Sequence, residues 1–278
     1  MKVYVSNYLS RSISILDYST LEFERDIKLD ENIYPHNFCI DNRQQLAYIP
    51  SSLDGELYVL DLSIGKIIDN ISIGGKLTNI ALCNDELFIS NEDSNSIYIL
   101  DVKTSNPIGV IGVDNMPHGF DIDSINNRLY VACINSIICI DTISKSICKK
   151  IDTDFKSWHI KLDRNKKEIY TSTLDGKVVV IDEESLKIIK IIATGIKASN
   201  GLATFWGTES GNLIVHPFWT TNLKISTAKQ VVIIAKNNPD ALKLSSGNPF
   251  SPSSVTKTGV NMKIAINDTT IDSLVSTL

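Results

Sequence analysis

The chain has 278 residues, a formal net charge of −5 and a sequence pI near 5.4, so it lacks the basic footprint of a nucleic-acid-binding protein. Its hydrophobic content of 43% is enough for a packed core, whereas no apolar run approaches the roughly 18 residues that a membrane span needs. We therefore expect one folded domain over residues 1–278 with no membrane span and no nucleic-acid partner.

The N-terminal residues lead directly into an apolar alternating run at residues 3–5, with no apolar signal region and no cleavage site before it. This start predicts a cytoplasmic protein, with a removed leader as the open alternative.

Short β-rich runs in the chain end in an aspartate at regular intervals. The spacings between successive aspartates are 44, 40, 40 and 41 residues for Asp17, Asp61, Asp101, Asp141 and Asp182. Asp268 follows 86 residues later, which is two further steps, and the intervening copy falls near residues 223–227 without its aspartate. A fixed period of about 40 residues built from short strands predicts a β-propeller or a related array.

The clearest copy of this unit spans residues 117–141, with the sequence PHGFDIDSINNRLYVACINSIICID. We expect strands at 118–123, 128–132, 136–140 and 146–152, because alternating runs separated by turn residues form an antiparallel meander. One such sheet cannot bury both faces alone. It needs neighbouring sheets, and a radial arrangement supplies them.

An aromatic residue precedes each closing aspartate, in the strands YVSN, YIPS, FISN, YVAC and YTST. Together with the ILD strand ends and the Pro-His-Gly segment, these strands resemble the YVTN family of β-propeller repeats. The resemblance covers residues 1–192 firmly and the rest weakly, with a divergent part from about residue 195.

The resemblance and the spacing predict an all-β propeller of four-stranded antiparallel blades. Seven markers favour seven blades, and six blades with a divergent tail is the alternative. The chain begins at the second strand of the first blade, so we expect the missing innermost strand to return from the C-terminus, where residues 269–278 are enough for one strand.

The closing aspartates begin the turn from the third strand to the fourth in each repeat. An aspartate there accepts hydrogen bonds from backbone N–H groups two or three residues later. We therefore interpret these aspartates as structural rather than catalytic.

The five cysteines form no CxxC pair and mostly fall within or beside strand runs, so we expect them to be buried and reduced. A disulfide between Cys133 and Cys139, on neighbouring strands of one hairpin, is conceivable but not expected without an export signal.

The loops that lead into the innermost strands should share one mouth of the central channel. Their equivalent positions hold polar and aromatic side chains that form the candidate ligand site: His36, Thr78, His118, Trp158, Asn200 and Asp240, with His159 one residue on. Such groups around a concavity suit a small ligand or a protein partner. The alternative is that the histidines only bond loop backbone. No metal is expected, because His36 and His118 lie two blades apart and zinc needs three or four close ligands.

One register of the innermost strands carries a charge pair, Asp121 and Lys161, in adjacent repeats. Because charges near a core are usually paired, we expect an ion pair between blades there, with a polar channel lining as the alternative.

No catalytic motif is present: the sequence lacks a GxSxG elbow, HExxH, a P-loop and a dinucleotide fingerprint. The leading hypothesis is a monomeric, non-enzymatic scaffold without a cofactor that binds a protein partner or a small ligand at the channel mouth. The resemblance implies two alternatives: an enzyme such as a lactone hydrolase or a metal-assisted lyase, and a redox-associated subunit. The sequence contains no CxxCH haem motif.

Overall fold

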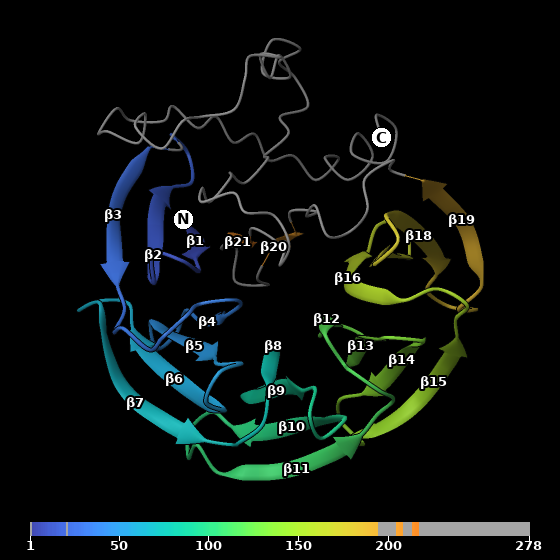
Figure 1. Ribbon diagram of the computed structural model, residues 1–278, viewed down its shortest axis with the longest axis horizontal. Coiled ribbons are helices and arrows are strands. Elements are labelled where there is room, and N and C mark those ends of the chain that lie inside the picture. The colour runs from blue at the N-terminus through green and yellow to red at the C-terminus, as the bar shows by residue number, and fades with distance from the viewer. Residues whose placement is uncertain (1, 21, 194–203, 208–212, 217–278) are drawn as a thin grey trace.

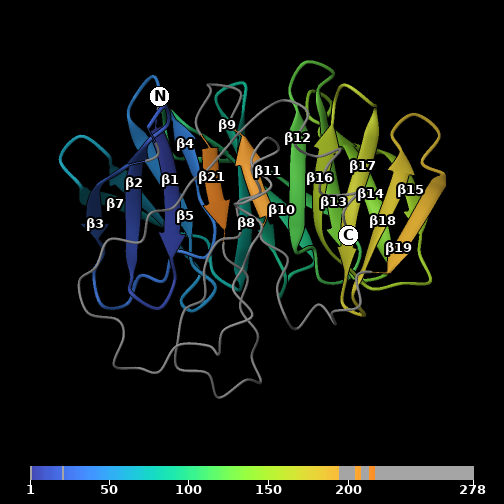
Figure 2. The same ribbon diagram turned by 90° about the horizontal axis from the view of Figure 1, so that it is seen from above.

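The structure is a computed structural model, and it describes residues 2–20, 22–193, 204–207 and 213–216. These residues form five sheets placed side by side around a common centre (Figure 1). Seen from the side, the strands nearest the centre run along the axis of the ring (Figure 2), whereas the outermost strands curve along its rim (Figure 1). No helix among the described residues is long and apolar enough to cross a membrane.

Four sheets have the predicted four-stranded antiparallel meander, and we number the sheets as blades in chain order. Blade two comprises β4 (Cys39–Asp41), β5 (Leu46–Pro50), β6 (Glu56–Asp61) and β7 (Lys66–Ser72). Blade three comprises β8 (Leu77–Cys83), β9 (Glu86–Asn91), β10 (Ser96–Asp101) and β11 (Pro107–Gly112). Blade four comprises β12 (Gly119–Asp123), β13 (Arg128–Cys133), β14 (Ser136–Asp141) and β15 (Ser146–Asp152). Blade five comprises β16 (Ser157–Asp163), β17 (Glu168–Thr173), β18 (Lys177–Asp182) and β19 (Ile188–Ala193).

Blade one combines the first three strands of the chain with two strands that follow blade five. It comprises β1 (Lys2–Asn7), β2 (Ser12–Asp17) and β3 (Phe23–Lys28) together with β20 (Thr204–Gly207) and β21 (Leu213–His216). The place beside β1 is taken by β21, whereas residues 269–278, which we expected there, lie outside the described residues. The β1–β21 pair is parallel, with Tyr4 opposite Ile214, unlike the antiparallel inner pairs of the other blades.

The prediction of seven blades, or of six, is wrong: the residues that the structure describes form five. The count rested on giving every sequence marker a blade of its own. The strands that follow blade five instead join β1, and the last two markers, near 223–227 and 264–268, lie outside the described residues.

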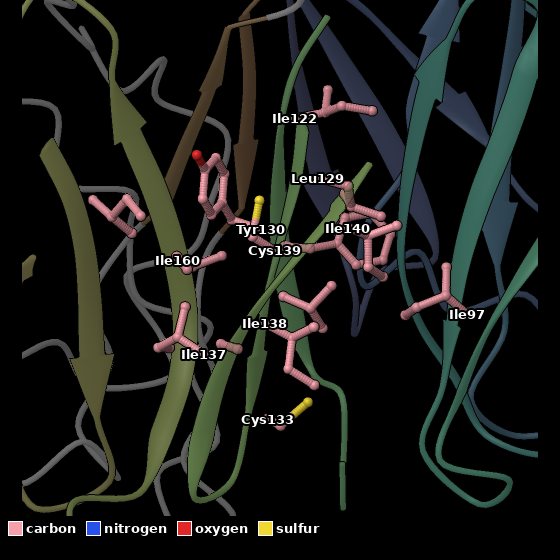
Figure 3. Close-up of a cluster of buried hydrophobic side chains, with 14 of the residues drawn as sticks. Ile97, Ile122, Leu129, Tyr130, Cys133, Ile137, Ile138, Cys139, Ile140 and Ile160 are labelled. Carbon is pink, nitrogen blue, oxygen red and sulfur yellow. The ribbon is translucent and has the colours of Figure 1, made fainter. Parts of the chain in front are cut away.

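The core lies between the sheets, where each blade is covered on both faces. In Figure 3, Ile97 of β10 and Ile160 of β16 approach the side chains of blade four from opposite sides. Ile137 and Ile138 are therefore both fully buried although they point to opposite faces of β14. Burial on both faces explains why third strands such as IICID read as continuous apolar runs. The fourth strands are largely exposed at the rim.

The structural role predicted for the closing aspartates is confirmed. Asp17 accepts hydrogen bonds from the backbone N–H groups of Ser19 (2.8 Å) and Thr20 (3.0 Å), and the other four close their turns in the same way. Backbone N–H donors hold the pKa of Asp17, Asp101 and Asp141 below its usual range. These carboxylates are therefore ionised, and each accepts hydrogen bonds from the backbone of its turn.

The five cysteines are thiols that form no disulfide, and four of them are buried while Cys148 is exposed. The register excludes the conceivable disulfide between Cys133 and Cys139. Cys133 lies opposite Ser136 and Cys139 opposite Tyr130, so the two cysteines are three ladder positions, about 10 Å, apart.

Candidate ligand site at one end of the ring

Four of the predicted site residues come together in space, and we call them the histidine cluster: His36, His118, Trp158 and His159. The ring centroid of His118 lies 5.9 Å from that of His36, 3.7 Å from that of Trp158 and 5.1 Å from that of His159. His118 and Trp158 are stacked, with 22° between their planes. Side chains from blades two, four and five therefore converge, even though His36 and His118 lie two blades apart.

A glycine allows the stack between His118 and Trp158 to form. A Cβ atom added to Gly119 would lie 2.7 Å from the carbonyl oxygen of Trp158 and 2.8 Å from the Cα of His159. No side chain fits against backbone at that distance. The glycine of the Pro-His-Gly segment thus lets β12 approach β16, and this approach places the His118 ring on Trp158.

A β-bulge explains how two successive residues of β16 both reach His118. The β16–β17 ladder passes from Ser157↔Thr173 to Ile160↔Thr171, so Trp158 and His159 lie in the irregular step. Successive side chains of a regular strand point to opposite faces, whereas a bulge re-aims them. The β8–β9 ladder has a similar step at Thr78.

Glu92 is a site residue that sequence reasoning missed. It follows β9, is 6% exposed, and its Oε1 lies 2.5 Å from Nδ1 of His118, while Oε2 pairs with the ammonium group of Lys76. The signal was available: β8 and β9 are antiparallel, so the end of β9 must lie beside the start of β8, at the same end of the ring.

The charges in this site follow from burial and from these two contacts. Burial lowers the pKa of His118, and this effect outweighs the hydrogen bond with Glu92, which raises it. Burial raises the pKa of Glu92, but its bonds to His118 and Lys76 outweigh burial and leave the pKa lowered. At neutral pH Glu92 is therefore a carboxylate and His118 a neutral imidazole.

The carboxylate determines which nitrogen of His118 carries the proton. Because ionised Glu92 can only accept, Nδ1 of His118 carries the hydrogen and donates it. The lone pair then resides on Nε2, which is buried and has no hydrogen-bond partner among the residues that the structure describes. The Nε2 atom of His118 is thus a hydrogen-bond acceptor whose orientation is set by Glu92.

The other two histidines of the cluster are also neutral. Burial, aided by the neighbouring His118, lowers the pKa of His36 to about 3. Burial likewise lowers the pKa of His159 well below its ordinary value. Tyr8 lies edge-on to His36, with centroids 6.2 Å apart, and adds an aromatic neighbour that the sequence did not single out.

Of the remaining predicted residues, the structure describes Thr78. Thr78 is buried, and its hydroxyl lies 2.9 Å from that of Ser90 and bonds the backbone carbonyl of Pro117 at 3.4 Å. It therefore ties blade three to the loop that carries His118. Asn200 and Asp240 lie outside the described residues.

The predicted ion pair between Asp121 and Lys161 is confirmed, with 2.8 Å between the carboxylate and the ammonium nitrogen. The same carboxylate accepts the backbone N–H of Leu162 at 3.0 Å, so it fastens the innermost strand of blade four to that of blade five. Among the residues that the structure describes, the histidine cluster included, no group of three His, Cys, Asp or Glu residues is arranged to hold a metal ion.

Comparison with solved structures identifies the scaffold. The hydrazine synthase of Kuenenia stuttgartiensis matches with a TM-score of 0.56 and 18% identity, over 72% of this chain and 60% of that chain. The dihydro-heme d1 dehydrogenase NirN in complex with DHE matches with a TM-score of 0.51 and 16% identity, over 66% of this chain and 42% of that chain. The scaffold is a β-propeller.

At these identities the similarity shows the fold alone. This chain spans less than two thirds of either protein. No family model and no curated protein matches the sequence. The resemblance to the YVTN repeats therefore stays a prediction, whereas the propeller fold is shown.

Proposed function

We propose that this chain is a non-catalytic propeller that binds a small, uncharged ligand at the histidine cluster, through an N–H or O–H group of the ligand. The observation that carries the proposal is the buried Nε2 lone pair of His118. A buried polar group left unsatisfied costs about 1–3 kcal/mol, and a ligand that donates a hydrogen bond to it recovers that free energy.

The charge of the site favours an uncharged ligand. The three histidines of the cluster are neutral, and the carboxylate of Glu92 is compensated by Lys76. A charged ligand would lose its hydration without meeting an opposite free charge, which is costly. The aromatic rings of Tyr8, His36 and Trp158 offer flat apolar faces instead.

Burial favours a small ligand over a protein partner. His118 and His159 are 5% and 4% exposed, whereas His36 and Trp158 are partly exposed. A ligand that donates a hydrogen bond to Nε2 of His118 must therefore reach a buried atom. A protein partner can reach it only with one side chain.

Matched pairs of probes test the proposal. Phenol and indole each carry one donor, and anisole and 1-methylindole are the same rings with that donor methylated. We expect phenol and indole to raise the melting temperature and to change the tryptophan fluorescence, and the methylated probes to have much smaller effects.

The variant His118→Phe removes the acceptor and keeps an aromatic ring, so it should abolish the difference between the probes of each pair. Tyr58→Phe is the control, since Tyr58 lies on β6, the third strand of blade two, and its hydroxyl bonds Asp54. Equal binding of donor and methylated probes, no binding of either, or a preference that survives His118→Phe would contradict the proposal.

A further inference from the structure

Two cysteines of blade four lie in contact at its outer edge. The Sγ atoms of Cys139 on β14 and Cys148 on β15 are 3.2 Å apart, and Cys148 is exposed while Cys139 is 1% exposed. A disulfide bond is about 2.05 Å long, so the two sulfurs need to approach by only about 1 Å. Their strands are neighbours, which keeps the backbone within the reach of such a bond.

A β-bulge creates this contact. The β14–β15 ladder passes from Cys139↔Lys149 to Ile140↔Ile147, which leaves Cys148 as the extra residue. In a regular ladder Cys148 would point away from the face that carries Cys139 and Lys149. The bulge turns its side chain toward Cys139.

The same bulge recurs in every blade, but the cysteine pair does not. The equivalent positions hold Ile15 and Glu24, Val59 and Ile68, Ile99 and Ile108, and Val180 and Ile189. The extra residue is exposed in all four of these blades, and the three isoleucines are 51% (Ile68), 42% (Ile108) and 54% (Ile189) exposed. The other four blades form the bulge with an aliphatic side chain on the third strand and isoleucine or glutamate on the fourth, so packing does not explain two thiols.

We propose that Cys139 and Cys148 form a thiol–disulfide exchange site that reacts with small-molecule disulfides. The exposed Cys148 thiolate attacks a sulfur of the small disulfide, forming a mixed disulfide and releasing one small thiolate. Cys139 then loses its proton to solvent and attacks the Cys148 sulfur. This step forms the Cys139–Cys148 bond and releases the second small thiolate.

The surroundings of the pair assign the order of the two steps. The guanidinium Nη1 of Arg128 lies 3.5 Å from Sγ of Cys148 and also pairs with the Asp141 carboxylate. Cys148 is exposed to a disulfide in solution, whereas Cys139 is buried. Burial and the contact with Cys148 raise the pKa of Cys139 to about 12, so Cys139 does not react first. The bond formed would fasten the outer strand β15 to β14 at the bulge and would open again with dithiothreitol.

The test uses the folded protein and the aromatic disulfide 5,5′-dithiobis(2-nitrobenzoate). We expect two equivalents of coloured thiolate per chain, a mass lower by two hydrogens, and one peptide pair linking residues 139 and 148. Because Cys39, Cys83 and Cys133 are buried, Cys148→Ile should release almost none. Cys139→Val should release one equivalent and keep the adduct.

Both replacements copy the pair Val59 and Ile68 of blade two, so they suit the fold. Cys133→Ser is the matched control, and it should still release two equivalents. A wild-type protein that stops at one equivalent with a lasting adduct would overturn the proposal. So would two equivalents released from folded Cys148→Ile.

Discussion

The neutral histidines of the cluster predict a loss of stability in mild acid. His36 has a pKa of about 3 in the folded protein, against 6.5 for the ordinary side chain. Below pH 6.5 the His36 side chain binds a proton in the unfolded chain but not in the folded chain. The free energy of unfolding therefore decreases as the pH falls, down to about pH 3. At pH 5 this difference amounts to about 2 kcal/mol for His36.

The window between pH 8 and pH 5 isolates the histidines. Carboxylates with a lowered pKa, such as Asp17 and Asp101, contribute stability that is lost only near and below 3.8, the ordinary value. His118 and His159 have lowered pKa values and add to the loss in the same direction as His36. Glu92 and Lys76, the charged groups that act on His36, form their own ion pair, and the lowered pKa of Glu92 keeps it ionised throughout this range.

Urea unfolding at pH 8 and pH 5 measures this effect. The variant His36→Phe should lose about 2 kcal/mol less than the wild type between the two pH values. Comparing two pH values cancels any change in stability that the substitution causes at both. Tyr58→Phe should keep the full loss. An identical loss in the wild type and in His36→Phe would refute the claim that His36 is held neutral by burial.

Two further predictions concern the geometry around His118. Gly119→Ala should destabilise the protein by about 1–3 kcal/mol in urea unfolding, since its Cβ would meet the Trp158 carbonyl oxygen at 2.7 Å. Gly112→Ala, with nothing within 4 Å of its Cβ, should change stability little, and equal effects would contradict the close approach of β12 and β16. Glu92→Gln frees the proton of His118 to occupy either ring nitrogen, because an amide both donates and accepts. The preference for phenol over anisole should then fall, and an unchanged preference would show that Glu92 does not set the tautomer.

The sequence predicted what each repeat determines locally. Strands such as IYILD and the turn that Asp101 closes depend on contacts within a few residues, so they recur wherever the pattern does. The Asp121–Lys161 pair was predictable as well, because equivalent positions of adjacent blades must meet.

The number of blades and the details of the site depend on longer-range geometry. The local sequence of β21 does not indicate that it pairs with β1 instead of starting a blade of its own. Glu92 comes from a second strand, so a search limited to the loops before the first strands passed over it. The contact between Cys139 and Cys148 depends on a bulge, which shifts the register by a residue that sequence periodicity does not show.

The most direct test of the site is the protonation of His118 in the folded protein. Long-range proton–nitrogen NMR correlations distinguish an imidazole nitrogen that carries hydrogen from one that carries a lone pair. At pH 7.5 the structure predicts hydrogen on Nδ1, bonded to Glu92, and a lone pair on Nε2. Hydrogen on Nε2, or on both nitrogens, would contradict the proposed ligand acceptor.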